Sequence, residues 1–314
     1  MVLENGPERT PVVVTGGSGF IGRAAVRELR ERGYPVTVVD QVPYATEDQG
    51  VRVVTGDLRD AAVREAAVTP GTGAIVHLAA LTSVLKSVEL PEDTYQENVA
   101  VTHGLLELAR QREVQTFVLA STNAVIGDVG TATITLDLPT RPLTPYGATK
   151  AACEMLLSGY SGAYGMTTCA LRFTNVYGPG MSHKDSFVPR MMRAAMAGEG
   201  VRVYGTGEQR RDLVHVDDVV RAIALALESG YSGRAIVGAG HSVSVLEMVQ
   251  TVREVTGAEL PVEHVPAPQG EMPAVVVDVS ASAATIGFTP AISLADGLAT
   301  AWKYFSDLDL KATP

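Results

Sequence analysis

The feature that constrains this chain most is a glycine-rich segment near the N-terminus, between a strand pattern and a helix pattern. It reads Pro11-Val-Val-Val-Thr-Gly-Gly-Ser-Gly-Phe-Ile-Gly22. Residues 12–14 are typical of a short buried strand, and residues 20–32 are typical of a helix. Glycines allow positive φ and a close approach of the backbone, while the free N–H groups at a helix start favour a phosphate. Together these features predict a dinucleotide-binding turn rather than an ordinary glycine-rich turn.

The second predicted strand, residues 36–40, ends on an acid. Asp40 lies 18 residues past Gly22, close to the place expected for a carboxylate that accepts the adenosine ribose hydroxyls. A carboxylate there would repel a 2′-phosphate, so the sequence predicts NAD rather than NADP as the cofactor.

Composition limits the class of protein. The chain has 314 residues, 46% of them hydrophobic, and a net charge of −10, which suits a compact globular fold and makes nucleic acid an unexpected partner because no basic run occurs. Cys153 and Cys169 form no disulfide framework and no metal-ligand spacing, so both are expected to be small apolar fillers and no metal is expected. Residues 1–10 do not resemble a signal peptide and no apolar run matches a membrane span, so a cytoplasmic location is the default expectation.

Strand and helix patterns alternate through the first half of the chain. Further strands are expected at residues 51–55, 74–78, 115–120 and 167–172, which predicts an α/β fold with a Rossmann-type, doubly wound parallel sheet. The pattern changes after residue 172, where a Met-rich helix (187–197), a strand (201–204) and helices at 217–229, 280–286 and 292–305 are expected. The predicted division is an NAD-binding domain over residues 1–172, rejoined by 212–232, and a smaller C-terminal α/β substrate domain, mainly residues 173–314.

Residues that follow the predicted strands are candidates for a site, because ligands bind at the carboxyl ends of parallel strands. Asp57 follows the third strand and could accept from an adenine amino group, or it could cap the next helix. Ala79 and Ala80 follow the fourth strand and could lie along a cofactor or allow close helix packing. Ser121 and Thr122 end the fifth strand, where hydroxyls suit either catalysis or capping.

The helix predicted at 145–164 carries Tyr146 and Lys150, four residues apart and therefore on one face. An ammonium beside a phenol favours the phenolate, so Lys150 is expected to lower the pKa of Tyr146. A tyrosine of this kind can remove or return a hydroxyl proton near neutral pH.

Two adjacent arginines, Arg210 and Arg211, occur in a predicted turn over residues 205–212. Arginine forks suit a diphosphate. Without further context, a solvated pair at a rim is the preferred interpretation.

Considered together, these residues resemble the extended short-chain dehydrogenase/reductase family, in its UDP-glucose 4-epimerase-like branch of NAD-dependent nucleotide-sugar epimerases and dehydratases. The resemblance covers about residues 11–305. Its motifs are Thr-Gly-Gly-Ser-Gly-Phe-Ile-Gly at 15–22, Gly-Asp-Leu at 56–58, His-Leu-Ala-Ala at 77–80, Asn98, Ser-Thr at 121–122, Tyr-x-x-x-Lys at 146–150, Asn-Val-Tyr-Gly-Pro at 175–179 and Gln-Arg-Arg-Asp-Leu-Val-His-Val-Asp-Asp at 209–218.

The resemblance implies roles for individual residues. The implied cofactor contacts are Gly16, Gly19, Phe20, Ile21, Gly22, Asp40, Asp57, Leu58, Leu78, Ala79, Ala80, Asn98, Tyr146, Lys150 and Phe173. Thr122 is implied to hydrogen-bond the sugar hydroxyl, Tyr146 to be the acid/base and Lys150 to hold the nicotinamide ribose, so the catalytic set is Thr122, Tyr146 and Lys150. The implied substrate contacts are Thr82, Thr122, Asn175 and Arg211. A homodimer formed through the helices near 95–110 and 146–164 is also implied.

Three positions depart from the family pattern. Ile126 stands where a tyrosine is usual, and Asn123 and Ala124 stand where 4,6-dehydratases have Asp-Glu. The stretch Pro268-Gln-Gly-Glu271 lacks the arginine that commonly binds the second phosphate.

The function expected from these features is NAD-dependent epimerisation of a nucleotide-activated sugar, at C4 through a 4-keto intermediate. A net dehydrogenase, ketoreductase or decarboxylase on the same scaffold begins with the same hydride step and is the alternative. A non-catalytic NAD-binding regulator is a further alternative, against which the set Thr122, Tyr146 and Lys150 argues.

Overall fold

A seven-stranded parallel sheet organises the molecule, which is a computed structural model describing residues 9–267 and 272–312. The strand order is β11-β7-β5-β4-β1-β2-β3, and every pair in it is parallel. The strands are β1 (Val12–Thr15), β2 (Val36–Asp40), β3 (Val51–Thr55), β4 (Ala74–His77), β5 (Thr116–Thr122), β7 (Thr167–Phe173) and β11 (Gly233–Val237). The predicted doubly wound Rossmann-type sheet is therefore confirmed.

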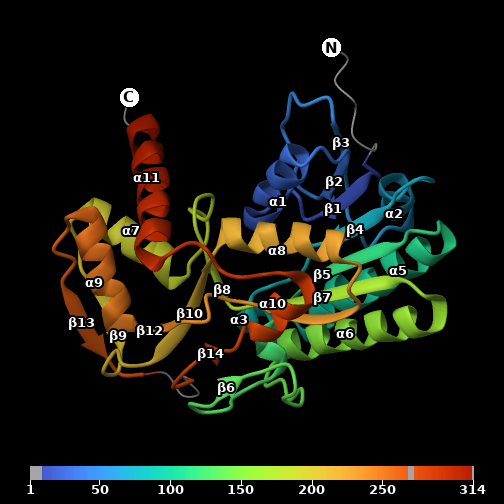
Figure 1. Ribbon diagram of the computed structural model, residues 1–314. Coiled ribbons are helices and arrows are strands. Elements are labelled where there is room, and N and C mark those ends of the chain that lie inside the picture. Colours follow the sequence, from blue (N-terminus) through green and yellow to red (C-terminus); the bar gives the residue numbers. More distant parts are fainter. Residues whose placement is uncertain (1–8, 268–271, 313–314) are drawn as a thin grey trace.

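Helices cover both faces of this sheet (Figure 1). On one face lie α1 (Phe20–Glu31), α8 (Val216–Ser229) and α10 (Ser280–Ile286), and on the other lie α2 (Ala61–Ala67), α5 (Val101–Gln111) and α6 (Pro145–Tyr164). Alternate strand residues serve the two faces: Val12 and Val14 pack into the core beneath α1 and α8, whereas Val13 packs into the core beneath α5 and α6. This alternation explains why the strands are apolar on successive residues.

The helical segment over residues 91–111 is interrupted by a π-helical turn. It consists of α4 (Pro91–Tyr95), a π-helical turn η1 (Gln96–Ala100) and α5, and it follows the short helix α3 (Val84–Glu89). Because a π turn carries one extra residue, it changes the direction of the side chains within it, which include Asn98.

The C-terminal part lies beside the carboxyl edge of the large sheet (Figure 1). It contains α7 (Phe187–Ala197), β9 (Val201–Tyr204), α9 (Val245–Thr256), β13 (Val262–Val265) and α11 (Leu294–Ala312). Smaller sheets connect the two parts: β12 (Ser242–Ser244), β10 (Arg210–His215) and β8 (Asn175–Tyr177) form one, and β14 (Val276–Val277) pairs with β6 (Thr133–Ile134). The smaller C-terminal α/β domain is thus present.

Some predicted elements need correction. Arg210 and Arg211 lie in β10 and not in a turn, because residues 210–215 pair with β8 and β12. The sequence predicts that residues 212–232 rejoin the NAD-binding domain. In the structure residues 233–237 rejoin it as well, because they form β11 and pair with β7 in the large sheet. The last helix begins at Leu294 and continues to Ala312, past the expected end at residue 305.

In the described part of the chain, no helix combines the length and apolar character needed to cross a bilayer. Residues 9–267 and 272–312 also contain no group of three or more His, Cys, Asp or Glu side chains placed to hold a metal ion.

Candidate active site

One cavity of about 980 Å³ lies where the large sheet meets the C-terminal part. It is formed at the carboxyl ends of β1, β2, β4, β5 and β7, as expected for a ligand site in a parallel sheet. The predicted site residues that line it are Gly16, Gly19, Phe20, Ile21, Gly22, Asp40, Asp57, Leu58, Leu78, Ala79, Ala80, Thr82, Thr122, Tyr146, Lys150, Phe173, Asn175 and Arg211.

The glycine-rich turn fits a dinucleotide. Gly16 adopts a φ of 69°, and a Cβ on Gly22 would overlap the carbonyl oxygen of Gly16. Helix α1 begins after Gly19 with no side chain bonded to its first N–H groups, so they can receive a phosphate. Residues 16–22 therefore form a cradle suited to the diphosphate of NAD.

Asp40 ends β2 at the edge of this cradle. Its two carboxylate oxygens accept from the backbone N–H groups of Ser18 and Val42, each at 3.0 Å. Each carboxylate oxygen can accept more than one hydrogen bond, so the ribose hydroxyls could still be bound. The side chain is thereby fixed in orientation before a cofactor arrives.

The structure distinguishes the two interpretations of Asp57. The helix cap is Asp60, which accepts from the N–H of Ala62 at 2.9 Å. Asp57 instead accepts from Arg59, at 2.9 Å from Nε and 2.6 Å from Nη2, and this contact lowers the pKa of the Asp57 carboxyl. Asp57 is an ionised acceptor at the cavity wall, which is the property that an adenine amino group needs.

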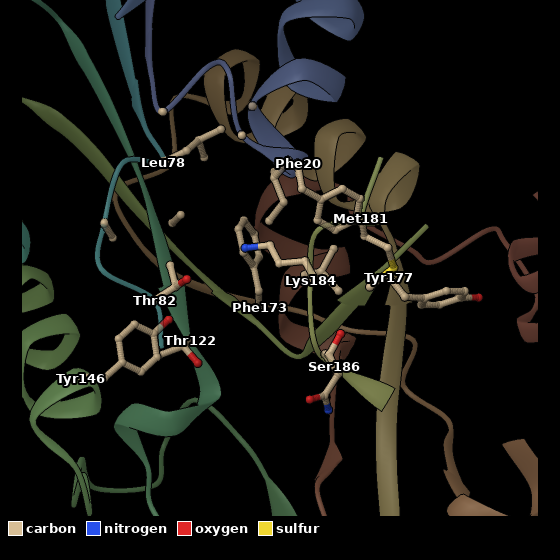
Figure 2. Close-up of a pocket in the computed structure, with 18 of the residues that line it drawn as sticks. Phe20, Leu78, Thr82, Thr122, Tyr146, Phe173, Tyr177, Met181, Lys184 and Ser186 are labelled. Atoms are coloured by element: carbon tan, nitrogen blue, oxygen red, sulfur yellow. The ribbon is translucent and has the colours of Figure 1, made fainter. Parts of the chain in front are cut away.

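Tyr146 and Thr122 lie together on one wall of the cavity, with Thr82 beside them (Figure 2). Burial raises the pKa of the Tyr146 phenol to about 12, and its hydrogen bond with Thr122 acts in the opposite direction. The expected lowering of this pKa by Lys150 is wrong for the ligand-free protein. The phenol loses its hydration on burial, and this effect dominates.

Lys150 is 3% exposed and donates from Nζ to the carbonyl oxygen of Ala120 at 2.9 Å. Burial lowers the pKa of this ammonium, while the charges of Cys153 and Glu154 raise it. The side chain thus connects α6 to the end of β5, and it lines the cavity beside the predicted catalytic pair.

A buried ion pair supports this part of α6. Arg172 and Glu154 make two parallel bonds of 2.9 and 2.7 Å, and both side chains are almost fully buried. The hydroxyl of Ser121 donates to the same Glu154 carboxylate at 2.6 Å. Ser121 is therefore a support for Glu154, and Thr122 is the strand-end hydroxyl next to Tyr146.

Asn98 is the predicted cofactor contact that the structure places elsewhere. It is 1% exposed and does not line the cavity. Its side-chain oxygen accepts from the N–H of Leu81 at 2.8 Å, and its amide nitrogen donates to the Leu81 carbonyl and to Thr149. Because the π turn directs Asn98 into the interior, its role is to hold the loop after β4 against α6.

The two arginines of β10 face different environments, as alternate residues of a strand do. Arg211 lines the cavity and donates to the Arg210 carbonyl at 2.8 Å. Arg210 is directed to the Ser242 carbonyl oxygen and to Glu247. Asn175 on β8 lies opposite Leu213 and donates to the Asp212 carbonyl at 2.9 Å. Arg211 therefore lies in the cavity wall, where the family resemblance implies a substrate contact, and Arg210 does not line the cavity.

Comparison with known proteins identifies the family. The sequence pattern of the NAD dependent epimerase/dehydratase family matches residues 12–239. The chain belongs to this family.

Members of the family resemble the chain over nearly its whole length. A dTDP-glucose 4,6-dehydratase of Streptomyces griseus is 35% identical over 93% of this chain and 94% of its own. The structure of the UDP-glucose 4-epimerase of Thermotoga maritima, solved with UDP-glucose, is 30% identical and has a TM-score of 0.89. The match covers 95% of this chain and 99% of the epimerase chain. The structure of MoeE5 with UDP-glucose and NAD is 36% identical and has a TM-score of 0.85. This match covers 96% of this chain and 99% of the MoeE5 chain. The cofactor of this NAD-dependent family is NAD.

Several cavity residues were not predicted from the sequence. They are Lys184, Ser186, Phe187, Arg190, Arg202, Tyr204 and Gln209. Most of them belong to the loop before α7, to α7 itself and to β9, which carry no motif. One feature of the sequence could have indicated these residues. The loop before α7 directly follows β8, and β8 carries the predicted substrate contact Asn175.

Of the departures from the family pattern, the structure describes the position of Ile126 but not the stretch 268–271. Ile126, 2% exposed, packs in a small apolar cluster with Ile134 and Val277, so this position contributes apolar packing. Residues 268–271, where the arginine is missing, lie outside the described residues.

Proposed function

We propose that this protein is an NAD-dependent epimerase that inverts C4 of a nucleotide-activated sugar. One observation carries the proposal. The glycine cradle, the pair Thr122 and Tyr146, and the polar residues Asn175 and Arg211 line a single continuous cavity. A cofactor, a reacting hydroxyl and a substrate diphosphate could therefore be bound side by side.

NAD supplies the chemistry of accepting a hydride and returning it. The chain supplies the proton chemistry: Tyr146 Oη takes the proton of the sugar 4-hydroxyl, and Thr122 holds that hydroxyl by a hydrogen bond. Loss of this proton and of the C4 hydride leaves a 4-keto sugar. When the ketone turns its other face, Tyr146 returns the proton to O4 as hydride adds, which completes the inversion.

The dehydratase relatives raise the question of water elimination. Elimination at C5 and C6 needs an acid and a base beyond the tyrosine. The residues after Thr122 are Asn123 and Ala124, which form a short 3₁₀ turn capped by the Thr122 hydroxyl. Since neither side chain titrates, epimerisation is favoured over dehydration. Net oxidation, reduction or decarboxylation remains the alternative on this scaffold.

A ligand screen with one variant tests the proposal. Among nucleotide sugars, the substrate should raise the melting temperature of the NAD-loaded protein. Arg211→Ala should weaken binding of that sugar by about ten- to a hundredfold, because charge-assisted bonds contribute about 1.5–3 kcal/mol each. Arg210→Ala is the matched control and should have a smaller effect. Equal binding by Arg211→Ala and the parent would mean that the substrate is not a nucleotide sugar.

A homodimer in the cytoplasm is part of this proposal. Large apolar side chains are exposed on α3, α4 and α6, and these helices pack against one another. They are Val84, Leu85, Val88, Tyr95, Met155 and Tyr164. Exposed apolar groups gathered on neighbouring helices favour burial against a second copy.

A further inference from the structure

Lys184 is a cation of the cavity that belongs to none of the sequence motifs. It lies in the loop between β8 and α7 and is partly buried. Figure 2 shows its side chain extending across the cavity toward the wall that carries Thr82, Thr122 and Tyr146. In the proposed reaction this wall receives the C4 hydroxyl of the sugar. The Lys184 ammonium is therefore directed at the sugar end of the site.

Hydrogen bonds fix the backbone that carries Lys184. Its N–H donates to the Met181 carbonyl at 2.9 Å, which closes a turn. Arg193 of α7 donates to the carbonyl oxygens of Ser182 and Lys184, at 3.1 and 3.2 Å. Because this turn is bonded to a helix, the lysine starts from a fixed position at the cavity wall, as a ligand-binding side chain requires.

Within residues 9–267 and 272–312, Lys184 makes no ion pair. The neighbouring Asp185 instead makes two bonds of 2.7 Å with Arg190. The acids that line the cavity all come from the Rossmann part, and they are Asp40, Asp57 and Glu97. A partly buried ammonium without a carboxylate partner favours an anionic group on the ligand that enters the cavity.

The direction of Lys184 limits which anionic group of a nucleotide sugar it can meet. A hexose bound through a diphosphate at C1 has C4 on the opposite side of its ring. The carbon group next to the C4 end that can carry a negative charge is C6, which is a hydroxymethyl group in a neutral hexose and a carboxylate in a uronic acid. We infer that Lys184 binds a C6 carboxylate, so that the substrate is a nucleotide-linked uronic acid. This inference rests on the proposed function.

The test compares two ligands that differ only at C6, UDP-glucuronic acid and UDP-glucose, in calorimetry with the NAD-loaded protein. The parent should bind the uronate more tightly by about tenfold, the scale of one charge-assisted bond. Lys184→Gln should abolish this preference by weakening uronate binding alone, and Lys184→Arg, which keeps the charge, should retain most of it. Arg211→Ala, at the proposed diphosphate contact, should weaken both ligands alike. Lys303→Gln, an exposed lysine on α11 outside the cavity, is the matched control and should bind both as the parent does.

Other outcomes would overturn the inference. If the parent binds UDP-glucose as tightly as the uronate, the site does not recognise a carboxylate. If Lys184→Gln keeps the preference of the parent, other residues hold the carboxylate. If this variant weakens both ligands alike, the lysine contacts a group that the two sugars share. A parent that binds neither sugar, and neither free UDP nor free dTDP, contradicts the proposed function itself, and this result differs from all the others.

Discussion

At the residue scale, burial controls the proton on Tyr146. With a pKa raised to about 12, the phenol is protonated near neutral pH in the ligand-free protein. In the proposed reaction Tyr146 must lose this proton to act as the base. The positive charge of oxidised nicotinamide in bound NAD would favour the phenolate.

Replacement of this phenol tests its role. Tyr146→Phe keeps the ring and removes the ionisable hydroxyl, so kcat should fall by at least about a hundredfold while NAD stays bound. Because the base must be deprotonated, the kcat of the parent should rise with pH, and this rise should be absent in the variant. Turnover by Tyr146→Phe at the parent rate would exclude Tyr146 as the base.

His77 gives a second prediction at this scale. Its ring nitrogens contact the hydroxyls of Thr15 at 2.7 Å and Thr102 at 3.0 Å, and burial, with a smaller effect of Lys150, lowers the pKa of His77 to about 3. The unfolded chain binds a proton near pH 6.5 and the folded one does not, so stability falls as the pH falls below 6.5. From pH 7 to pH 5 the parent should lose about 2 kcal/mol more than His77→Gln in urea denaturation. Parallel losses in the two proteins would contradict this.

Residue-scale sequence analysis succeeded where the relevant interaction is local. Tyr146 and Lys150 are four residues apart on a helix, and Thr122 ends a strand, so their presence at one site could be predicted. The pKa of Tyr146 could not be, because it depends on how the rest of the chain buries the ring. Lys184 could not be found either, since the direction of a loop side chain is set by the packing of α7 and β9.

At the element scale, the pair Arg172 and Glu154 connects β7 to α6, the helix that carries Tyr146 and Lys150. The connection also includes β5 through Ser121. Nη1 of Arg172 is buried without a hydrogen-bond partner among the described residues, so Arg172 depends on Glu154 for its compensation.

Removal of one member of this pair should be costly. Glu154→Gln should lower the free energy of unfolding by about 3–5 kcal/mol, because it leaves a buried guanidinium uncompensated. The double variant Glu154→Gln, Arg172→Met should be more stable than that single variant. Arg202→Gln, which breaks an exposed pair, should cost about 1 kcal/mol or less. A loss below about 1 kcal/mol for Glu154→Gln in urea denaturation would show that the pair does not hold the helix.

Most helices and strands could be predicted from the sequence. The elements that were predicted wrongly have physical causes. The bounds of α6, α7 and β9 match those expected, because proline, glycine and apolar periodicity mark them. The π turn around Asn98 has no sequence signature, so its inward direction was not foreseen. Strand β10 was taken for a turn because its pairing partners, β8 and β12, are distant in the sequence or very short.

At the scale of the whole molecule, the exposed apolar side chains on α3, α4 and α6 predict how two copies would meet. Met155→Glu and Leu85→Glu would each place a charge in that surface, and the dimer should dissociate in light scattering after size exclusion. Leu308→Glu, on α11, is the control and should leave the mass unchanged. A parent protein that is already monomeric at micromolar concentration would contradict the proposed dimer.

The central claim is that one cavity brings NAD, a catalytic tyrosine and a nucleotide sugar together for inversion at C4. The most direct measurement incubates the NAD-loaded protein with the nucleotide sugar that stabilises it, without added NAD, and follows C4 configuration by NMR and absorbance at 340 nm. The account predicts that the two C4 epimers reach equilibrium with no net change in absorbance. Stoichiometric appearance of NADH, or a product that has lost water, would contradict it.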